Sequence, residues 1–117
     1  MSKVGSRNIS EMNKLSALAK QRTARRLRQA DDYAHRIIED AKSVGLQMTV
    51  VGSLAKNSFK PHSDIDLLVR GADAPHRRAT AERLVAKHLR GTDLPYDLIF
   101  EADLTEDRLK EMLHDIV

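Results

Sequence analysis

The sequence predicts an α/β (α+β) protein in which helices flank a small mixed β-sheet and a long helix forms the N-terminus. Three short apolar segments, residues 47–51, 65–69 and 96–100, are the expected strands. The segments before, between and after them carry apolar residues at steps of three and four, which predicts helices. The length of 117 residues suits one compact structural domain.

The first helix is expected to be unusually long. Between Asn8 or Ser10, either of which can cap a helix, and Gly45 the chain contains neither proline nor glycine. A helix of about 35 residues is about 50 Å long, which exceeds the width of a domain this size. We therefore expect residues 1–45 to form a long basic helix whose C-terminal half packs on the core. Its first part should project toward a partner, a second copy or solvent. The apolar positions of the packed half are Leu27, Ala30, Ala34, Ile37, Ile38, Ala41 and Val44.

Residues 46–117 should form the rest of the domain. The strand at 47–51 is apolar enough to be central in the sheet, and a short helix is expected at 53–57. Pro75 suits the first turn of a helix over residues 75–90. Thr105 is the expected cap of a last amphipathic helix.

The composition restricts the environment and the partners. Formal net charge is +3, but residues 1–45 carry ten basic against five acidic residues, and residues 46–117 carry ten against twelve. There is no cysteine, no apolar run near the roughly 20 residues of a membrane span, and no apolar signal-peptide segment. We expect a soluble, cytoplasmic protein without a membrane partner. Only four aromatic residues are present, so a base-stacking surface for nucleic acid is not supported.

Four positions in and before the second expected strand indicate a site for phosphate and metal. Gly52 allows a close backbone approach to a ligand, and Ser53 offers a hydroxyl and free N–H groups at the start of a helix. Asp64 and Asp66 alternate with apolar residues, so both should project from one face of a strand. Two neighbouring carboxylates repel each other unless a cation lies between them, and such hard oxygen ligands suit Mg²⁺.

A third carboxylate is needed if two metal ions act together in phosphoryl or nucleotidyl transfer. Asp97 is the best candidate, because it lies in a short apolar strand, and it can also accept the proton of an attacking hydroxyl. Its face of that strand should also carry Ile99 and Glu101. Glu101 and Asp93 are rival ligands, and Asp97 as a plain exposed acid on an edge strand is the alternative interpretation.

This set of residues resembles a known superfamily. Gly52-Ser53, ten residues, Asp64-x-Asp66 and a later acid on a strand resemble the nucleotidyltransferases typified by DNA polymerase beta. Residues 63–69, with the short length, resemble the minimal nucleotidyltransferases, called MNT proteins, many of which are antitoxins encoded beside a HEPN-domain ribonuclease toxin. The resemblance covers about residues 46–100 and implies that residues 46–117 form a minimal nucleotidyltransferase domain.

The resemblance also implies a reaction and roles by position. Two Mg²⁺ ions and an NTP, usually ATP, would be bound, and a nucleoside monophosphate would pass to a hydroxyl while pyrophosphate leaves. Gly52 and Ser53 would hold the outer phosphates. Asp64 and Asp66 would ligate the metals, and Asp97 would complete the catalytic and metal site. In antitoxin relatives the acceptor is a tyrosine of the toxin.

The sequence departs from the usual pattern after Gly52-Ser53. Many relatives have Ala-Arg-Gly where this chain has Ala55-Lys56-Asn57. Lys56 keeps the positive charge for nucleotide binding but loses the bidentate fork of arginine, and Asn57 can adopt the left-handed conformation that glycine would supply. Lys60 is a second candidate for phosphate contact, although most such loop lysines are simply solvated. No role is assigned to His62.

The basic run from Arg22 to Arg28 has three interpretations: a solvated helix face, a docking surface for an acidic partner, or a contact to nucleic-acid phosphates. No base-reading motif accompanies it, so specific DNA recognition is not supported. Self-association through this helix is a further expectation.

The leading functional hypothesis is an Mg²⁺-dependent nucleotidyltransferase that moves AMP from ATP to a hydroxyl, a tyrosine by resemblance, of a partner protein such as a HEPN-type toxin. The alternative is a non-enzymatic antitoxin that uses the same fold and its long helix only for binding. Transfer to RNA or a small molecule is a weaker idea, because no acceptor-binding domain is expected in the chain.

Overall fold

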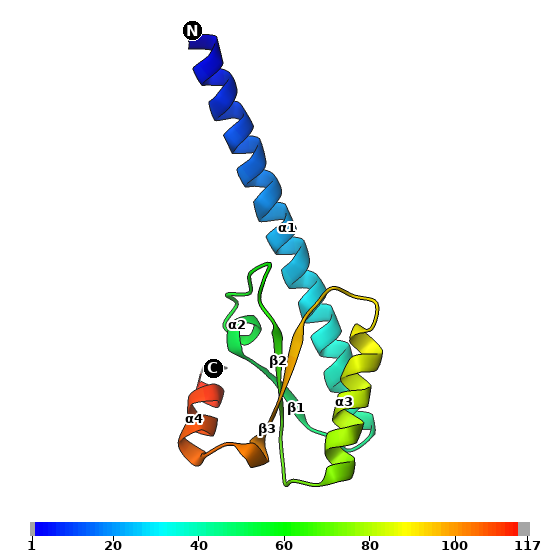
Figure 1. Ribbon diagram of the computed structural model, residues 1–117. Coiled ribbons are helices and arrows are strands. Elements are labelled where there is room, and N and C mark those ends of the chain that lie inside the picture. Colours follow the sequence, from blue (N-terminus) through cyan, green and yellow to red (C-terminus); the bar gives the residue numbers. More distant parts are fainter. Residues whose placement is uncertain (1, 115–117) are drawn as a thin grey trace.

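The computed structural model describes the backbone of residues 2–114 and the side chains of residues 13–114. It confirms the fold class, a three-stranded mixed sheet with a long N-terminal helix and further helices (Figure 1). The elements in order are α1 (Ser2–Ser43), β1 (Met48–Val51), α2 (Gly52–Ala55), β2 (Ile65–Val69), α3 (Pro75–Leu89), β3 (Tyr96–Phe100), a 3₁₀ turn (Glu101–Asp103) and α4 (Glu106–His114).

Helix α1 projects far beyond the sheet (Figure 1). It has 42 residues, and the molecule measures 69 × 32 × 18 Å. The helix begins at Ser2 and not at the expected Asn8 or Ser10, because no proline interrupts the segment before them. Gly45, with φ +78°, follows its C-terminal end. Residues 13–22 are exposed along their whole length. No described helix has the apolar stretch that a membrane crossing needs.

The sheet has the order β1-β2-β3, with β1 antiparallel and β3 parallel to β2. The central strand is therefore β2, and the expectation that residues 47–51 would be central is wrong. The burial explains the difference, because four of the five β2 residues are buried whereas the two middle residues of β1 are only half-buried. An apolar edge strand resembles a central one in sequence when a helix covers one of its faces.

One face of the sheet holds the hydrophobic core, and helices α1 and α3 cover that face (Figure 1). Alternate β2 residues point into this core, and the small buried residues of α1 let that helix lie close to α3 and β1. The buried residues of α1 are Ala30, Ala34, Ile37 and Ala41, those of β2 are Ile65, Leu67 and Val69, and those of α3 are Ala81, Leu84, Val85 and Leu89. The intervening β2 residues, Asp66 and Leu68, project from the opposite face of the sheet.

A polar pair joins the two covering helices at the margin of the core. His88 Nε2 lies 2.8 Å from Asp40 Oδ2, and this hydrogen bond holds the pKa of Asp40 below its ordinary value. A lowered carboxyl pKa adds stability above the ordinary aspartate pKa of about 3.9, and this stability is lost as the pH falls through the lowered value. The pair therefore supports the packing of α3 on α1 at neutral pH.

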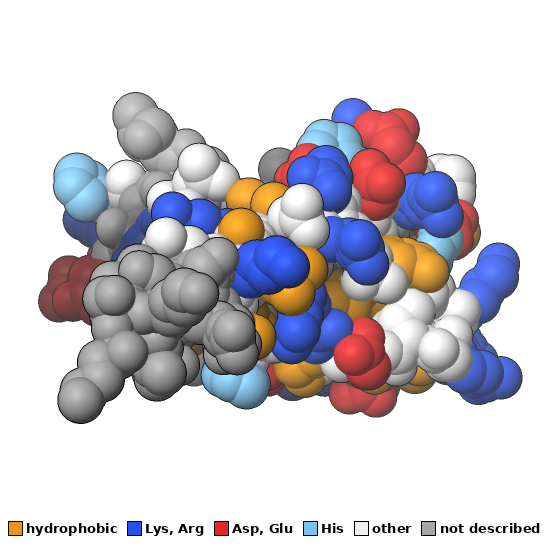
Figure 2. Space-filling model, turned by 90° about the horizontal axis from the view of Figure 1, so that it is seen from above, with side chains coloured by type: hydrophobic (Ala, Val, Ile, Leu, Met, Phe, Trp, Pro, Cys, Tyr) orange, Lys and Arg blue, Asp and Glu red, His pale blue; other side chains and the backbone are white. Residues whose placement is uncertain are grey.

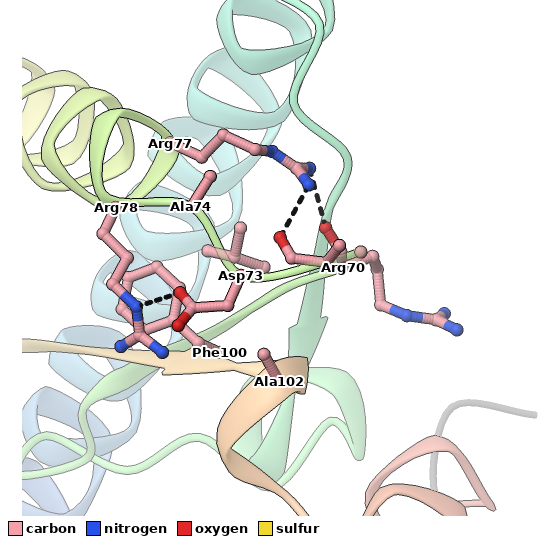
Figure 3. A pocket seen from close by; sticks show the side chains of 10 residues that line it. Arg70, Asp73, Ala74, Arg77, Arg78, Phe100 and Ala102 are labelled. Atoms are coloured by element: carbon pink, nitrogen blue, oxygen red, sulfur yellow. Dashed lines mark hydrogen bonds and ion pairs between the residues drawn. The ribbon is translucent and has the colours of Figure 1, made fainter.

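Two arginines of α3, Arg77 and Arg78, lie at the C-terminal ends of β2 and β3 (Figure 3). Arg78 donates hydrogen bonds to Asp73 (2.6 Å) and Asp103 (2.6 Å), and its guanidinium lies 4.4 Å from the centre of the Phe100 ring. Arg77 donates to two backbone carbonyls of the β2–α3 turn. The cavity between them is about 10 Å³, which is room for one water molecule at most. This cavity is therefore too small for a nucleotide.

Candidate functional site

Asp66 and Asp97 lie side by side on neighbouring strands. They are register partners in the parallel pairing of β2 with β3, and Val51 at the end of β1 is the register partner of Asp66 on the other side. Register partners share a face of a sheet, so both carboxylates project from the face that α1 and α3 leave uncovered. Asp64 lies two residues before Asp66, one residue outside the strand, and is exposed.

Gly52 packs directly against the carboxylate of Asp66. Its φ is +70°, in the left-handed region, and a Cβ built on it would collide with Asp66 Oδ2 and lie 3.2 Å from Asp66 Cγ. Any other residue would therefore be strained and would also displace this side chain. The sequence indicated a close backbone approach at Gly52, and the structure shows that the group it approaches is an acid of the candidate site.

The electrostatics of the three acids favour a bound cation. Burial raises the pKa of Asp66, and the charges of Asp97 and Asp64 raise it further. All three effects disfavour the ionised form of Asp66, and a divalent cation bound beside these carboxylates would offset them. The donors are hard carboxylate oxygens, which suit Mg²⁺. Within residues 13–114, however, no three acid or histidine groups are placed to coordinate one ion as they stand. Metal binding therefore requires these carboxylates to turn toward a common point.

Asp66 and Asp97 lie in a cleft of about 480 Å³ between the sheet and α4. The sequence did not indicate that α4 forms one wall. Thr105 caps this helix as expected, by accepting a hydrogen bond from the Arg108 N–H (3.2 Å). The amphipathic pattern of this helix and the one-turn spacing of Arg108 and Met112 do not reveal which part of the sheet it covers. The lining residues are Val51, Gly52, Lys56, Asp66, Asp97, Ile99, Arg108, Glu111 and Met112.

Of the remaining candidates for nucleotide binding, some line this cleft and others do not. Lys56 lines it, and Asn57, with φ +59°, adopts the left-handed conformation expected at this position. Ser53 and Lys60 are not among the lining residues. The backbone carbonyl of Ser53 accepts hydrogen bonds from the N–H (2.8 Å) and hydroxyl (3.3 Å) of Ser58, which holds the turn after α2 together.

The two alternative ligands to Asp97, which are Glu101 and Asp93, form hydrogen bonds with arginines outside the cleft. Glu101 accepts hydrogen bonds from Arg70 Nε (2.8 Å) and the Gly71 N–H (2.8 Å), and these lower its pKa. It begins the 3₁₀ turn, so the expectation that it shares a strand face with Asp97 is wrong; β3 ends one residue earlier. Asp93 accepts a hydrogen bond from Arg26 Nη1 at 2.7 Å. Of the three acids, Asp97 is the one that lies beside Asp66.

Comparison with known proteins assigns a family. The family model described as nucleotidyltransferase domain matches residues 34–116. This range begins in the part of α1 that packs on the core and includes β1, β2, β3 and the whole candidate site. Searches of the curated proteins and of the solved structures gave no match.

Proposed function

The chain belongs to the nucleotidyltransferase domain family, a family of nucleotidyl-transferring enzymes, and from this membership we propose that it transfers AMP from ATP to a hydroxyl of a partner protein. The observation that carries the proposal is the register of Asp66 with Asp97, with Gly52 packed against the first of them. Together they place two carboxylates on the wall of a cleft large enough for a nucleotide.

Different residues of the chain would bind the metal, bind the phosphates and accept the proton. Asp64, Asp66 and Asp97 would hold Mg²⁺, which when bound neutralises phosphate charge and activates the attacking oxygen. Lys56, on the cleft wall, offsets the negative charge of the outer phosphates, and Gly52 lines the same cleft. Ser53, the next residue, would contribute its hydroxyl or N–H groups only if it turned toward the bound phosphates. The acceptor oxygen attacks the α-phosphorus and the bond to pyrophosphate breaks. Asp97 accepts the hydroxyl proton.

The acceptor is proposed to be a tyrosine of a HEPN-type toxin encoded beside this protein, with both proteins in the cytoplasm. The likeness of residues 63–69 to MNT antitoxins supports this identity. The form of the molecule also supports a protein acceptor, because a projecting helix with exposed residues 13–22 offers a large surface to another chain. The same feature supports the second candidate function, in which the protein neutralises a partner by binding alone.

The test is transfer of label from ATP carrying radioactive α-phosphate. With Mg²⁺ and the purified product of the neighbouring gene, that product is expected to become labelled. The double variant Asp64→Asn/Asp66→Asn should label it at least about 100-fold less, because replacement of groups that only support metal ligands already lowers activity 10- to 100-fold. The variant Asp32→Asn, which removes an exposed acid of α1, is the matched control and should be unaffected.

A toxicity rescue assay separates the two candidate functions. If the double variant loses labelling but still protects cells from the neighbouring product, the protein acts by binding. If protection and labelling are lost together while the two proteins still associate, transfer is the neutralising step. Undiminished labelling by the double variant would remove the proposed site altogether.

A further inference from the structure

A second cleft of about 480 Å³ lies between α1 and the two loops that lead into the acid-bearing strands. Its residues carry mainly positive charge, since three arginines come from one helix. The lining residues are Arg22, Arg25, Arg26 and Gln29 of α1, Pro61 and His62 of the loop before β2, and Asp93 of the loop before β3. We call it the arginine cleft. It shares no lining residue with the cleft that holds Asp66 and Asp97.

Both loops of the arginine cleft are connected to the candidate active site. His62 comes two residues before Asp64, and Asp93 comes four residues before Asp97. The first loop is fixed by a turn, in which the Ser63 N–H donates to the carbonyl of Lys60 (3.0 Å). The second loop is joined to the start of β2, because the Ile65 N–H donates a hydrogen bond to the carbonyl of Pro95 in that loop (2.9 Å). A molecule bound in this cleft therefore lies against the loops that position the acids.

The three arginines are not equivalent. Arg26 holds the cleft together, because its guanidinium donates to the carboxylate (2.7 Å) and to the backbone carbonyl (2.9 Å) of Asp93. Its side chain is only 18% exposed, and its Nε is buried without a hydrogen-bond partner among the described residues. Arg22 and Arg25 are exposed. They supply charge to the surface without being needed for this contact.

The basic surface continues along α1 into an apolar one. Leu15 and Leu18 are 64% and 47% exposed. An α-helix turns about 100° per residue, so these two leucines, Arg22, Arg25 and Gln29 fall within an arc of about 100°. We call these five residues the docking stripe. Figure 2 looks down on this end of the molecule and shows Lys and Arg side chains lying among hydrophobic ones in the middle of the face.

We propose that the docking stripe and the arginine cleft bind an amphipathic helix of the acceptor protein, with acidic residues facing the arginines and apolar residues facing the leucines. The mixed character of the stripe favours protein over nucleic acid, because phosphates would pair with Arg22 and Arg25 but leave Leu15 and Leu18 exposed. The stripe carries no aromatic residue on which a base could stack. The inference rests on the proposed function and specifies where the acceptor is held during transfer.

Docking along α1 would direct the acceptor toward the site. The bound helix would run along the projecting part of α1 and end in the arginine cleft, beside the loops that precede Asp64 and Asp97. Charge complementarity at such a surface acts chiefly on encounter and on specificity. The stripe is therefore expected to affect the KM for the acceptor and to leave the turnover of bound acceptor unchanged.

The test reverses the charge of the two exposed arginines. The double variant Arg22→Glu/Arg25→Glu should bind the purified product of the neighbouring gene at least about tenfold more weakly, since each factor of ten is about 1.4 kcal/mol. Its KM for that acceptor should rise equally, with kcat and ATP binding unchanged. Leu15→Ser/Leu18→Ser should also weaken binding, and this loss should be insensitive to salt. The control Lys20→Glu introduces a negative charge at an exposed position about 170° around the helix from the stripe, and should leave binding unchanged.

Several results would overturn the docking proposal. One is that the Arg22→Glu/Arg25→Glu variant binds the neighbouring product as tightly as the wild type does. Another is that Lys20→Glu weakens this binding as much as the double variant. The third is that the wild type does not bind the neighbouring product at all. Displacement of the partner by an RNA duplex would assign the stripe to nucleic acid, and a dimer that the arginine variant dissociates would assign it to a second copy. Binding is measured apart from labelling, so binding without labelling supports docking and contradicts only the proposed transfer.

Discussion

Replacement of Asp66 by asparagine is expected to abolish nucleotidyl transfer and to make the metal-free protein more stable. The loss of activity should be at least about 100-fold, because a group that would hold the metal directly matters more than one that only supports a ligand. The gain in stability follows from the raised pKa of Asp66. Asparagine has nearly the same shape but carries no charge beside Asp97 and Asp64.

The size of the stability effect depends on pH. A raised pKa on folding means that the neutral form of Asp66 favours the folded state. This contribution is complete below the ordinary aspartate pKa of about 3.9 and is lost as the pH rises through the raised value. In EDTA at neutral pH, the Tm of Asp66→Asn should therefore exceed that of the wild type. Added Mg²⁺ should raise the wild-type Tm and have less effect on the variant.

Glu101→Gln is the matched control for this measurement. The hydrogen bonds from Arg70 and Gly71 lower the pKa of Glu101, so its charge favours the folded state above its unfolded pKa. This variant should lower the Tm at neutral pH, and added Mg²⁺ should not restore it. A lower Tm for Asp66→Asn in EDTA would show that the carboxylate is satisfied without a cation, and would contradict the proposed metal site.

Gly52→Ala is expected to cause the second large effect. Alanine in the left-handed conformation costs about 1–2 kcal/mol. Its Cβ would also collide with the carboxylate of Asp66 and push that side chain away from Asp97. Stability, measured by denaturant unfolding, should fall by at least this amount, and the transfer activity of the remaining folded protein should be lost.

Gly45→Ala separates the loss of stability from the loss of activity. Gly45 has φ +78°, but a Cβ placed there meets no atom within 4 Å. The backbone penalty of about 1–2 kcal/mol is therefore similar, while the candidate site stays intact. Gly45→Ala should lose stability and keep its activity. If the two alanine variants kept equal activity when folded, the contact between Gly52 and Asp66 would have no part in the function.

Local rules account for the parts of the fold and site that the sequence predicted. Alternation along β2 placed Asp66 away from the core, and the apolar surroundings of Asp97 indicated a strand. These two strands pair in register, which brings the acids together. Asn57 adopts the left-handed conformation because asparagine tolerates it at little energetic cost. Each of these predictions needs only a short segment of chain.

The parts that the sequence did not predict depend on long-range packing. The edge position of β1 depends on which strands pair, and an apolar strand covered by a helix on one side resembles a central one. The position of α4 over the acidic face cannot be read from its amphipathic pattern, which gives a face but no partner. The sequence favoured Asp97 but could not exclude Asp93 and Glu101, because only the fold shows that Arg26 and Arg70 form ion pairs with them.

The cleft between the sheet and α4 is expected to bind a nucleotide together with a divalent metal. Calorimetric titration with a non-hydrolysable ATP analogue tests it directly, since no acceptor is needed. The wild type should bind the analogue with Mg²⁺ and bind it at least about tenfold more weakly in EDTA, while Asp66→Asn/Asp97→Asn should bind weakly in both conditions. Equal affinity of the wild type and the double variant, or binding that does not depend on Mg²⁺, would contradict the claim.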